Sequence, residues 1–157
     1  MLTLEQARAQ MLEQLTFPTQ TETLNLQDAA NRICAEDVIS PINVPSFDNS
    51  AMDGYAVRLA DLQQSLTLSV AGKSFAGKPF QDEWSPLSAV RIMTGAMLPE
   101  GADAVLMQED AVVNEDGSVT FTKLPKPNQN IRRIGEDVKE GDIVLQQGAP
   151  LNAVSLP

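Results

Sequence analysis

Residues 46–58 read Ser-Phe-Asp-Asn-Ser-Ala-Met-Asp-Gly-Tyr-Ala-Val-Arg, and the polar part of this stretch has neither a helical nor a strand period. Polar groups in such a segment need partners, and binding residues concentrate on loops that a rigid scaffold positions. Asp53-Gly54 is a turn signal because glycine accepts a positive φ without steric cost. Tyr55 then begins an apolar run that predicts a strand. We therefore expect Asp53 at the tip of a tight turn, with its carboxylate facing outward.

Composition narrows the class of protein. The 157 residues are 43% hydrophobic but only 4% aromatic, which predicts an aliphatic core. A net charge of -10 would repel a polyphosphate backbone, so nucleic acid is not an expected partner. No apolar run approaches the roughly 18 residues that cross a bilayer, and the N-terminus lacks a signal-peptide pattern. We expect a soluble, cytoplasmic protein with no membrane partner.

The chain has no histidine and one cysteine, Cys34. This excludes an internal disulfide, a Ser-His or Cys-His nucleophile pair, and a zinc site of nitrogen and sulfur ligands within the chain. A metal ion held here would need oxygen ligands, which is typical of Mg²⁺ or Ca²⁺. Acid–base chemistry would depend on Asp, Glu, Lys or Tyr.

Periodicity predicts a mainly β fold with a few helices. Helices are expected at residues 2–15, with a capping box of Thr3 and Gln6, and at residues 25–32, with Asn25 as the cap. Strands are expected at 33–39, from Tyr55 onward, at 66–70, 90–93, 104–107 and 143–145, and as a hairpin of 111–113 with 118–122. A last helix at 152–156 would be cut after its first turn, so we expect a longer natural protein.

Three loops carry the polar residues without an evident packing role. If they converge, their arginines could grip a phosphate or oxyanion and their carboxylates could hold Mg²⁺. Other interpretations stay open: Asp53-Gly54 as a plain hairpin turn, the first loop as capping of its own backbone, and the third as a solvated ion-pair cluster. The first loop holds Asp48, Asn49, Ser50 and Asp53, the second is Thr94-Gly95, and the third holds Asn130, Arg132, Arg133, Glu136 and Asp137.

Four segments, in order, resemble the MoeA family of molybdopterin molybdenumtransferases, whose animal relative is the gephyrin E domain. They are residues 46–57, residues 91–103 with the runs Arg-Ile-Met-Thr-Gly-Ala and Leu-Pro-Glu-Gly-Ala-Asp, residues 107–109, and residues 130–138. The resemblance implies a homodimeric enzyme that uses Mg²⁺ to insert molybdate into adenylylated molybdopterin. Other proteins of molybdenum cofactor biosynthesis are further expected partners.

The resemblance also implies a MoeA N-terminal-like fold, divided into three parts. Residues 1–20 would be a helix that belongs with an absent α/β domain, residues 21–39 and 141–157 a small mixed domain, and residues 40–140 a β lasso domain. Because the large pterin-binding domain would be missing, this region alone is expected to be inactive.

Carried over by motif position, four residues would be catalytic: Asp53, Thr94, Glu136 and Asp137. Arg132, Asn49 and Ser50 would bind substrate, and either Asp53 or Asp137 could hold the metal. A non-catalytic interaction or scaffold module of gephyrin type is the alternative, and a free-standing anion-binding domain is a third.

Overall fold

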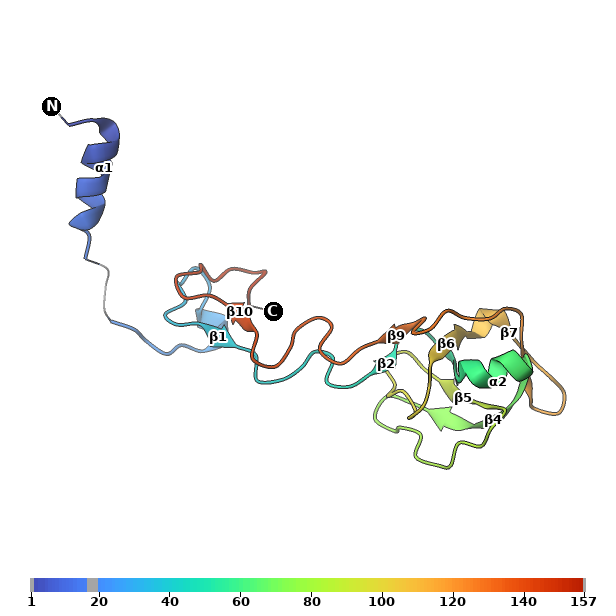
Figure 1. The fold of residues 1–157 in the computed structure, drawn as a ribbon. Coiled ribbons are helices and arrows are strands. Elements are labelled where there is room, and N and C mark those ends of the chain that lie inside the picture. The colour runs from blue at the N-terminus through green and yellow to red at the C-terminus, as the bar shows by residue number, and fades with distance from the viewer. Residues whose placement is uncertain (1, 17–19, 157) are drawn as a thin grey trace. The chain divides into compact units, whose positions relative to one another are not determined.

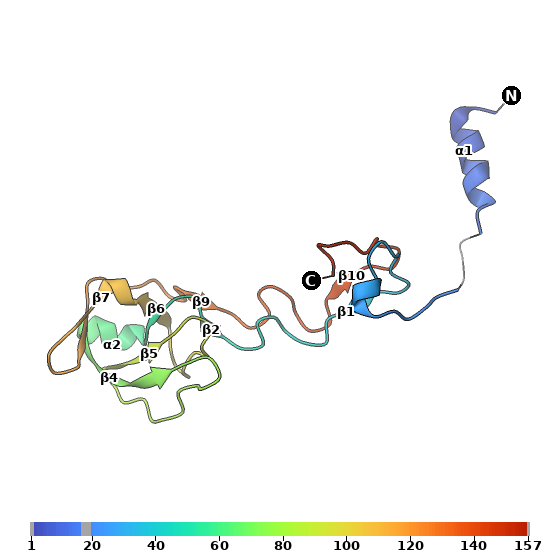
Figure 2. The ribbon, with the colours of Figure 1, turned by 180° about the vertical axis from the view of Figure 1, so that it is seen from behind.

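The computed structural model describes residues 2–16 and 20–156, and the chain divides into two compact units. One unit is made by the two ends of the chain, up to Val38 and from Leu145, and the other is Ile39–Val144. The fold is mainly β with two α-helices in the described residues, as expected from the sequence. Figures 1 and 2 show the elements from opposite sides. None of the described helices is long and apolar enough to cross a membrane.

The larger unit is built on a six-stranded sheet with the order β6-β3-β5-β4-β8-β7. β3 runs antiparallel to β5 and β6, β4 and β5 are parallel, and β8 is antiparallel to β4 and β7. The strands are β3 Gly54–Val57, β4 Thr67–Ser74, β5 Ser88–Ile92, β6 Ala104–Met107, β7 Ala111–Val113 and β8 Val119–Phe121. The register pairs Gly54 with both Ile92 and Met107, so β3 starts where β5 and β6 end.

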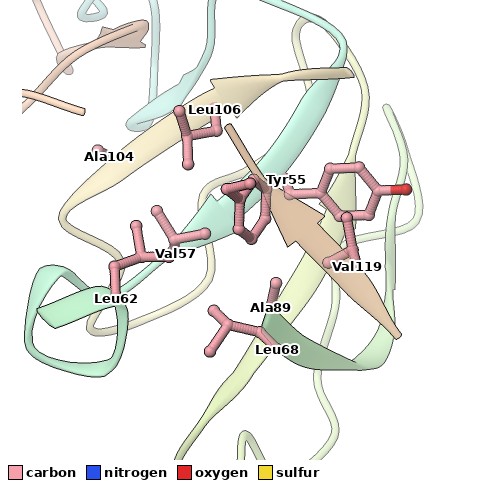
Figure 3. Close-up of a cluster of buried hydrophobic side chains, with 9 residues drawn as sticks. Tyr55, Val57, Leu62, Leu68, Ala89, Ala104, Leu106 and Val119 are labelled. Atoms are coloured by element: carbon pink, nitrogen blue, oxygen red, sulfur yellow. The ribbon is translucent and has the colours of Figure 1, made fainter. Parts of the chain in front are cut away.

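Hydrophobic residues cover both faces of this sheet. All four residues of β3 are buried. Because side chains alternate along a strand, those of β3 pack into two hydrophobic clusters, one on each face of the sheet. Tyr55 and Val57 belong to one cluster, shown in Figure 3, and Ala56 belongs to the other. Tyr55 meets Phe121 edge-on, with ring centroids 5.7 Å apart. β3 is thereby packed on both faces of the sheet, which gives its first residue a rigid support.

A short helix that the sequence did not predict, α2 Leu59–Gln64, covers part of the cluster in Figure 3. The side chain of Leu62, on α2, is buried in the same cluster as Val57. Arg58, just before α2, pairs with Asp61 at 2.9 Å. Six residues are too few for a recognisable helical period, and this helix depends on packing rather than propensity.

The ends of the chain form smaller elements. α1 Leu4–Glu13 has the predicted capping box, in which Thr3 and Gln6 bond reciprocally. The predicted second helix was too long: only η1 Leu26–Asp28 is helical, Asn25 makes no side-chain cap bond, and Asn31 has φ 65°. Residues 152–156 form a turn rather than the start of a helix; there the Asn152 side chain accepts hydrogen bonds from the chain.

The strand predicted at residues 33–39 is also shorter than expected. Only β1 Val38–Ile39 pairs as a strand, with β10 Ile143–Leu145, while Ile33 makes an isolated bridge to Pro150. The predicted segment, which Glu36 and Asp37 interrupt, therefore exceeds the length over which a partner strand is paired. β10 has the bounds predicted from the sequence.

Candidate functional site

Hydrogen bonds bring the three polar loops together at one end of the sheet, as the sequence predicted. β2 Asn49–Ser50 pairs antiparallel with β9 Ile131–Arg132, which joins the first loop to the third. The Gly95 amide donates to the Ser50 carbonyl at 2.8 Å, which joins the second loop to the first. β2 and β9 lie side by side in both views (Figures 1 and 2). Residues up to 86 positions apart in the chain are thus held in one place.

Asp53 lies just before β3 and its side chain reaches across to Thr94, two residues beyond the end of β5. Its Oδ1 accepts hydrogen bonds from the backbone N–H and the hydroxyl of Thr94, both at 2.7 Å. These bonds, first the backbone one, hold the pKa of the Asp53 carboxyl below its ordinary value, and the charge of Arg91 adds to the effect. Within the described part of the chain, Oδ2 accepts no hydrogen bond. Asp53 is therefore an ionised carboxylate with one oxygen anchored and one available.

The tight turn predicted at Asp53-Gly54 is wrong. Gly54 is the first residue of β3, it is absent from the positive-φ glycines, and no hairpin forms here. A Cβ added at Gly54 would lie 1.9 Å from the carbonyl oxygen of Leu106 on β6. Glycine is needed because two strands approach closely, and this close approach fixes the backbone beside Asp53.

Arg132 lies between two of the predicted catalytic acids. Its Nε donates to Glu136 at 2.8 Å, and its Nη2 bonds Asp137. The hydrogen bond with Glu136, followed by that with Asp137, raises the pKa of the Arg132 guanidinium. The bond from Arg132 is also the main reason that the pKa of Glu136 is lowered. All three side chains stay solvent-accessible, so an arriving anion or cation could exchange with these pairs.

Asp48 ties the first loop to the third. Its Oδ1 accepts from the backbone N–H of Ile134 at 2.8 Å, and its Oδ2 pairs with Arg133. The Ile134 bond, assisted by Arg133, lowers the pKa of the Asp48 carboxyl against the opposing effect of burial. Arg133 also donates to Asn128. Asp48 and Arg133 therefore hold the loops in place.

Asn49 and Ser50, the other predicted substrate-binding residues, are buried and bonded to their own loop. The Asn49 side chain donates to the Phe47 carbonyl at 3.2 Å, and the Ser50 hydroxyl donates to the Met52 carbonyl at 2.6 Å. This is the local backbone capping that was weighed as the alternative for this loop.

Sequence reasoning did not single out Arg91 and Gln108, which frame Asp53. Arg91 donates to the Gly54 carbonyl and to the Gln108 side chain, both at 2.6 Å, while the Gln108 amide donates to the Asp53 carbonyl at 3.1 Å. The available signal was a charged residue inside the apolar strand at 90–92, since a charge there needs a partner.

Residues 2–157 match the family model described as the MoeA N-terminal region (domain I and II). The chain belongs to this family. It is 81% identical, over all 157 residues, to the molybdopterin molybdenumtransferase of Haemophilus influenzae, of which it covers 39%. It is 39% identical over 137 residues to the protein of the same name from Bacillus subtilis, covering 82% of this chain and 32% of that one.

The MoeA N-terminal fold is also found in a solved structure. The molybdopterin biosynthesis moeA protein from Pyrococcus horikoshii matches 97% of this chain with a TM-score of 0.82 and 33% sequence identity. The chain covers 41% of that protein. It thus spans from about a third to about two fifths of the length of these relatives.

The acids of this MoeA N-terminal region fit a Mg²⁺ ion only in part. In residues 2–16 and 20–156, no three acidic, cysteine or histidine side chains are grouped to hold one ion. Mg²⁺ commonly takes one or two protein carboxylates and completes its shell with water and substrate phosphates. The available Oδ2 of Asp53 suits such a single ligand.

Proposed function

We propose that this chain is the N-terminal part of a cytoplasmic molybdopterin molybdenumtransferase, which inserts molybdate into adenylylated molybdopterin during molybdenum cofactor biosynthesis. The observation that carries the proposal is the 81% identity to an enzyme of that name over the whole chain. A second support is the convergence at one end of the sheet of Asp53, Thr94 and the Arg132 cluster (Arg132, Glu136 and Asp137), because it gathers charged and hydroxyl groups from separate loops in one exposed place.

In this proposal the residues of the site have two roles, metal binding and oxyanion binding. Asp53, oriented by Thr94, and Asp137 are the candidates for a carboxylate ligand of Mg²⁺. Mg²⁺, when bound, would neutralise charge on the phosphate and molybdate oxygens, which the acidic surface would otherwise repel. Arg132 would orient an oxyanion by its planar fork, with Glu136 and Asp137 holding the guanidinium until the ligand arrives.

We further propose that the active protein is a homodimer in which these loops complete a pocket formed by sequence beyond this chain. The chain spans 32–41% of the length of the relatives named above, and its described residues group no three side chains that could hold one metal ion. Both features are expected of a region that supplies some of the residues of a shared site.

Replacement of Asp53 by alanine in the full-length protein tests the proposal. Asp116 is a matched control, because it likewise accepts from a backbone N–H and a hydroxyl, those of Ser118, at 2.9 and 2.6 Å. Asp53→Ala should abolish molybdenum insertion, since a positioned carboxylate can be worth several kcal/mol in a transition state, or about a thousandfold in rate. Asp116→Ala should keep the parent rate. Molybdenum insertion at the parent rate by Asp53→Ala would overturn the assignment.

A further inference from the structure

One side chain of the larger unit bridges the ends of three strands. Arg91, on β5, donates through Nη1 to the Gly54 carbonyl of β3 at 2.6 Å and to the Ile92 carbonyl at 3.1 Å. Through Nη2 it donates to the Gln108 side chain, directly after β6, at 2.6 Å. Its guanidinium lies 5.2 Å from the centre of the Tyr55 ring. The planar fork of arginine, with several fixed donors, is what permits one residue to make these bonds together.

These bonds fix the backbone on the carbonyl side of Asp53 and do not involve its carboxylate. The Asp53 carbonyl accepts from the Gln108 amide at 3.1 Å, and the next carbonyl, that of Gly54, accepts from Arg91. Among the described residues, the carboxylate itself accepts hydrogen bonds from Thr94 alone. Arg91 therefore holds the Gly54 carbonyl directly, and through the Gln108 side chain it holds the residue whose backbone N–H bonds the Asp53 carbonyl.

We infer that Arg91 is a positioning residue for Asp53, and that Gln108 is the second half of the same frame. The effect on catalysis rests on the proposed function, in which Asp53 acts on substrate or metal. Packing of the buried strand β3 supports this backbone, and the bonds from Arg91 and Gln108 fix the two carbonyl groups next to the Asp53 side chain. A displacement of a catalytic group by about 1 Å can cost about a hundredfold in rate, so a polar frame at this place has a purpose beyond folding.

Amide hydrogen exchange in the 157-residue chain tests the positioning itself. Arg91→Lys keeps the charge but loses the fork, and Gln108→Ala removes the side-chain acceptor while keeping the backbone. Lys73→Gln is the control. Lys73 lies on β4, in register with Arg91 on β5, and its replacement removes one positive charge without changing the bonds to Gly54 or Gln108.

Both test variants should speed exchange of the Thr94 and Gln108 amides, by about tenfold in Arg91→Lys, with the rates of Val90 and Leu106 unchanged. Lys73→Gln should leave all four rates unchanged. Parent rates at Thr94 and Gln108 in both test variants would overturn the inference, and so would equal acceleration across the sheet, which would indicate a merely structural role. If Arg91→Lys does not fold, Gln108→Ala alone decides between these outcomes.

Kinetics of the full-length protein test the consequence. Arg91→Lys should lower kcat for molybdenum insertion about tenfold or more while KM for molybdate stays within about twofold, because the residue orients rather than binds. An unchanged kcat alongside faster Thr94 exchange would overturn the catalytic part of the inference. Failure of the proposed function would appear differently, as full activity in Asp53→Ala, and the exchange result would still decide whether Arg91 positions Asp53.

Discussion

At Gly54 the backbones of β3 and β6 approach so closely that no side chain fits between them. An added Cβ would lie 1.9 Å from the Leu106 carbonyl oxygen and 2.8 Å from its carbon. Both are backbone atoms in a buried sheet, so relief requires the strands to separate rather than a side chain to rotate. The position of Asp53 relative to β6 therefore depends on glycine at residue 54.

Gly54→Ala should destabilise the chain by about 3 kcal/mol, at the upper end of the cost of overpacking. Gly77→Ala is the comparison: Gly77 has φ 75° and open space around it, so alanine there meets only backbone strain of about 1 kcal/mol. Urea unfolding of the two variants measures both losses. A smaller loss at Gly54 than at Gly77 would contradict the steric argument.

Asp48 makes stability depend on pH in the acid range. Its pKa in the folded chain is lower than its ordinary value near 3.8, through the Ile134 amide and Arg133. A depressed carboxyl pKa adds stability above the unfolded value, and that stability is lost as pH falls through the folded value. Asp48→Asn should therefore cost about 1 kcal/mol at pH 7, because both partners are partly exposed and screened.

The difference in stability between Asp48→Asn and the parent should shrink as pH falls below about 3.8, because the unfolded parent then binds a proton before the folded one does, and it should be lost once pH passes the lowered pKa of the folded carboxyl. Thermal unfolding from pH 7 down to pH 2 gives the comparison. Asp82→Asn, at an exposed position of the same unit, serves as the control for charge alone. A constant difference between Asp48→Asn and the parent across this range would show that the carboxylate's charge is not what stabilises the loops.

Elements with a clear period and a nearby partner were predictable from the sequence. β6 and β10 have the predicted bounds, and β7 and β8 form the predicted hairpin. β2 and β9 were not predictable, since each has only two residues and owes its strand geometry to pairing with a segment about 80 positions away. The same pairing joins two of the three loops, so the sequence predicted that the loops converge but not the strand pairing that brings two of them together.

α1 shows the reverse case, in which a correct local prediction leaves a weak element. Its capping box satisfies the first amides, but none of its described residues is buried, and Leu4 and Met11 are 80% and 71% exposed. A helix of 10 residues without packing is marginal in water. Its amides should exchange far faster than those of β3, and Thr3→Ala should reduce its helicity further, at a cost of about 1 kcal/mol.

Hydrogen exchange followed by mass spectrometry, with circular dichroism for helicity, checks both statements about α1. In a protein shown to be monomeric, protection of Leu4–Glu13 equal to that of the sheet would contradict them. Exchange that slows as concentration rises would instead show that the exposed apolar residues find a partner in a second copy.

At the scale of the whole molecule, composition excluded several kinds of site, such as a disulfide or a histidine-based nucleophile pair, but did not by itself identify the function. The absence of histidine leaves oxygen and guanidinium chemistry, which is what Asp53, Thr94 and the Arg132 cluster offer. The convergence of the loops was predicted because each lay at the end of a strand. Arg91 and Gln108 were missed because their roles come from backbone carbonyls of other strands, which a linear sequence does not bring together.

The central claim is that this chain carries part of a molybdenum-inserting site and not all of it. The most direct measurement is formation of molybdenum cofactor from adenylylated molybdopterin, molybdate and Mg²⁺, with the 157-residue chain alone and with the full-length protein side by side. Because the described residues group no three side chains that could hold a metal ion, and the chain spans 32–41% of the length of the relatives named above, we predict turnover by the full-length protein only. Turnover by the folded chain alone would contradict the claim.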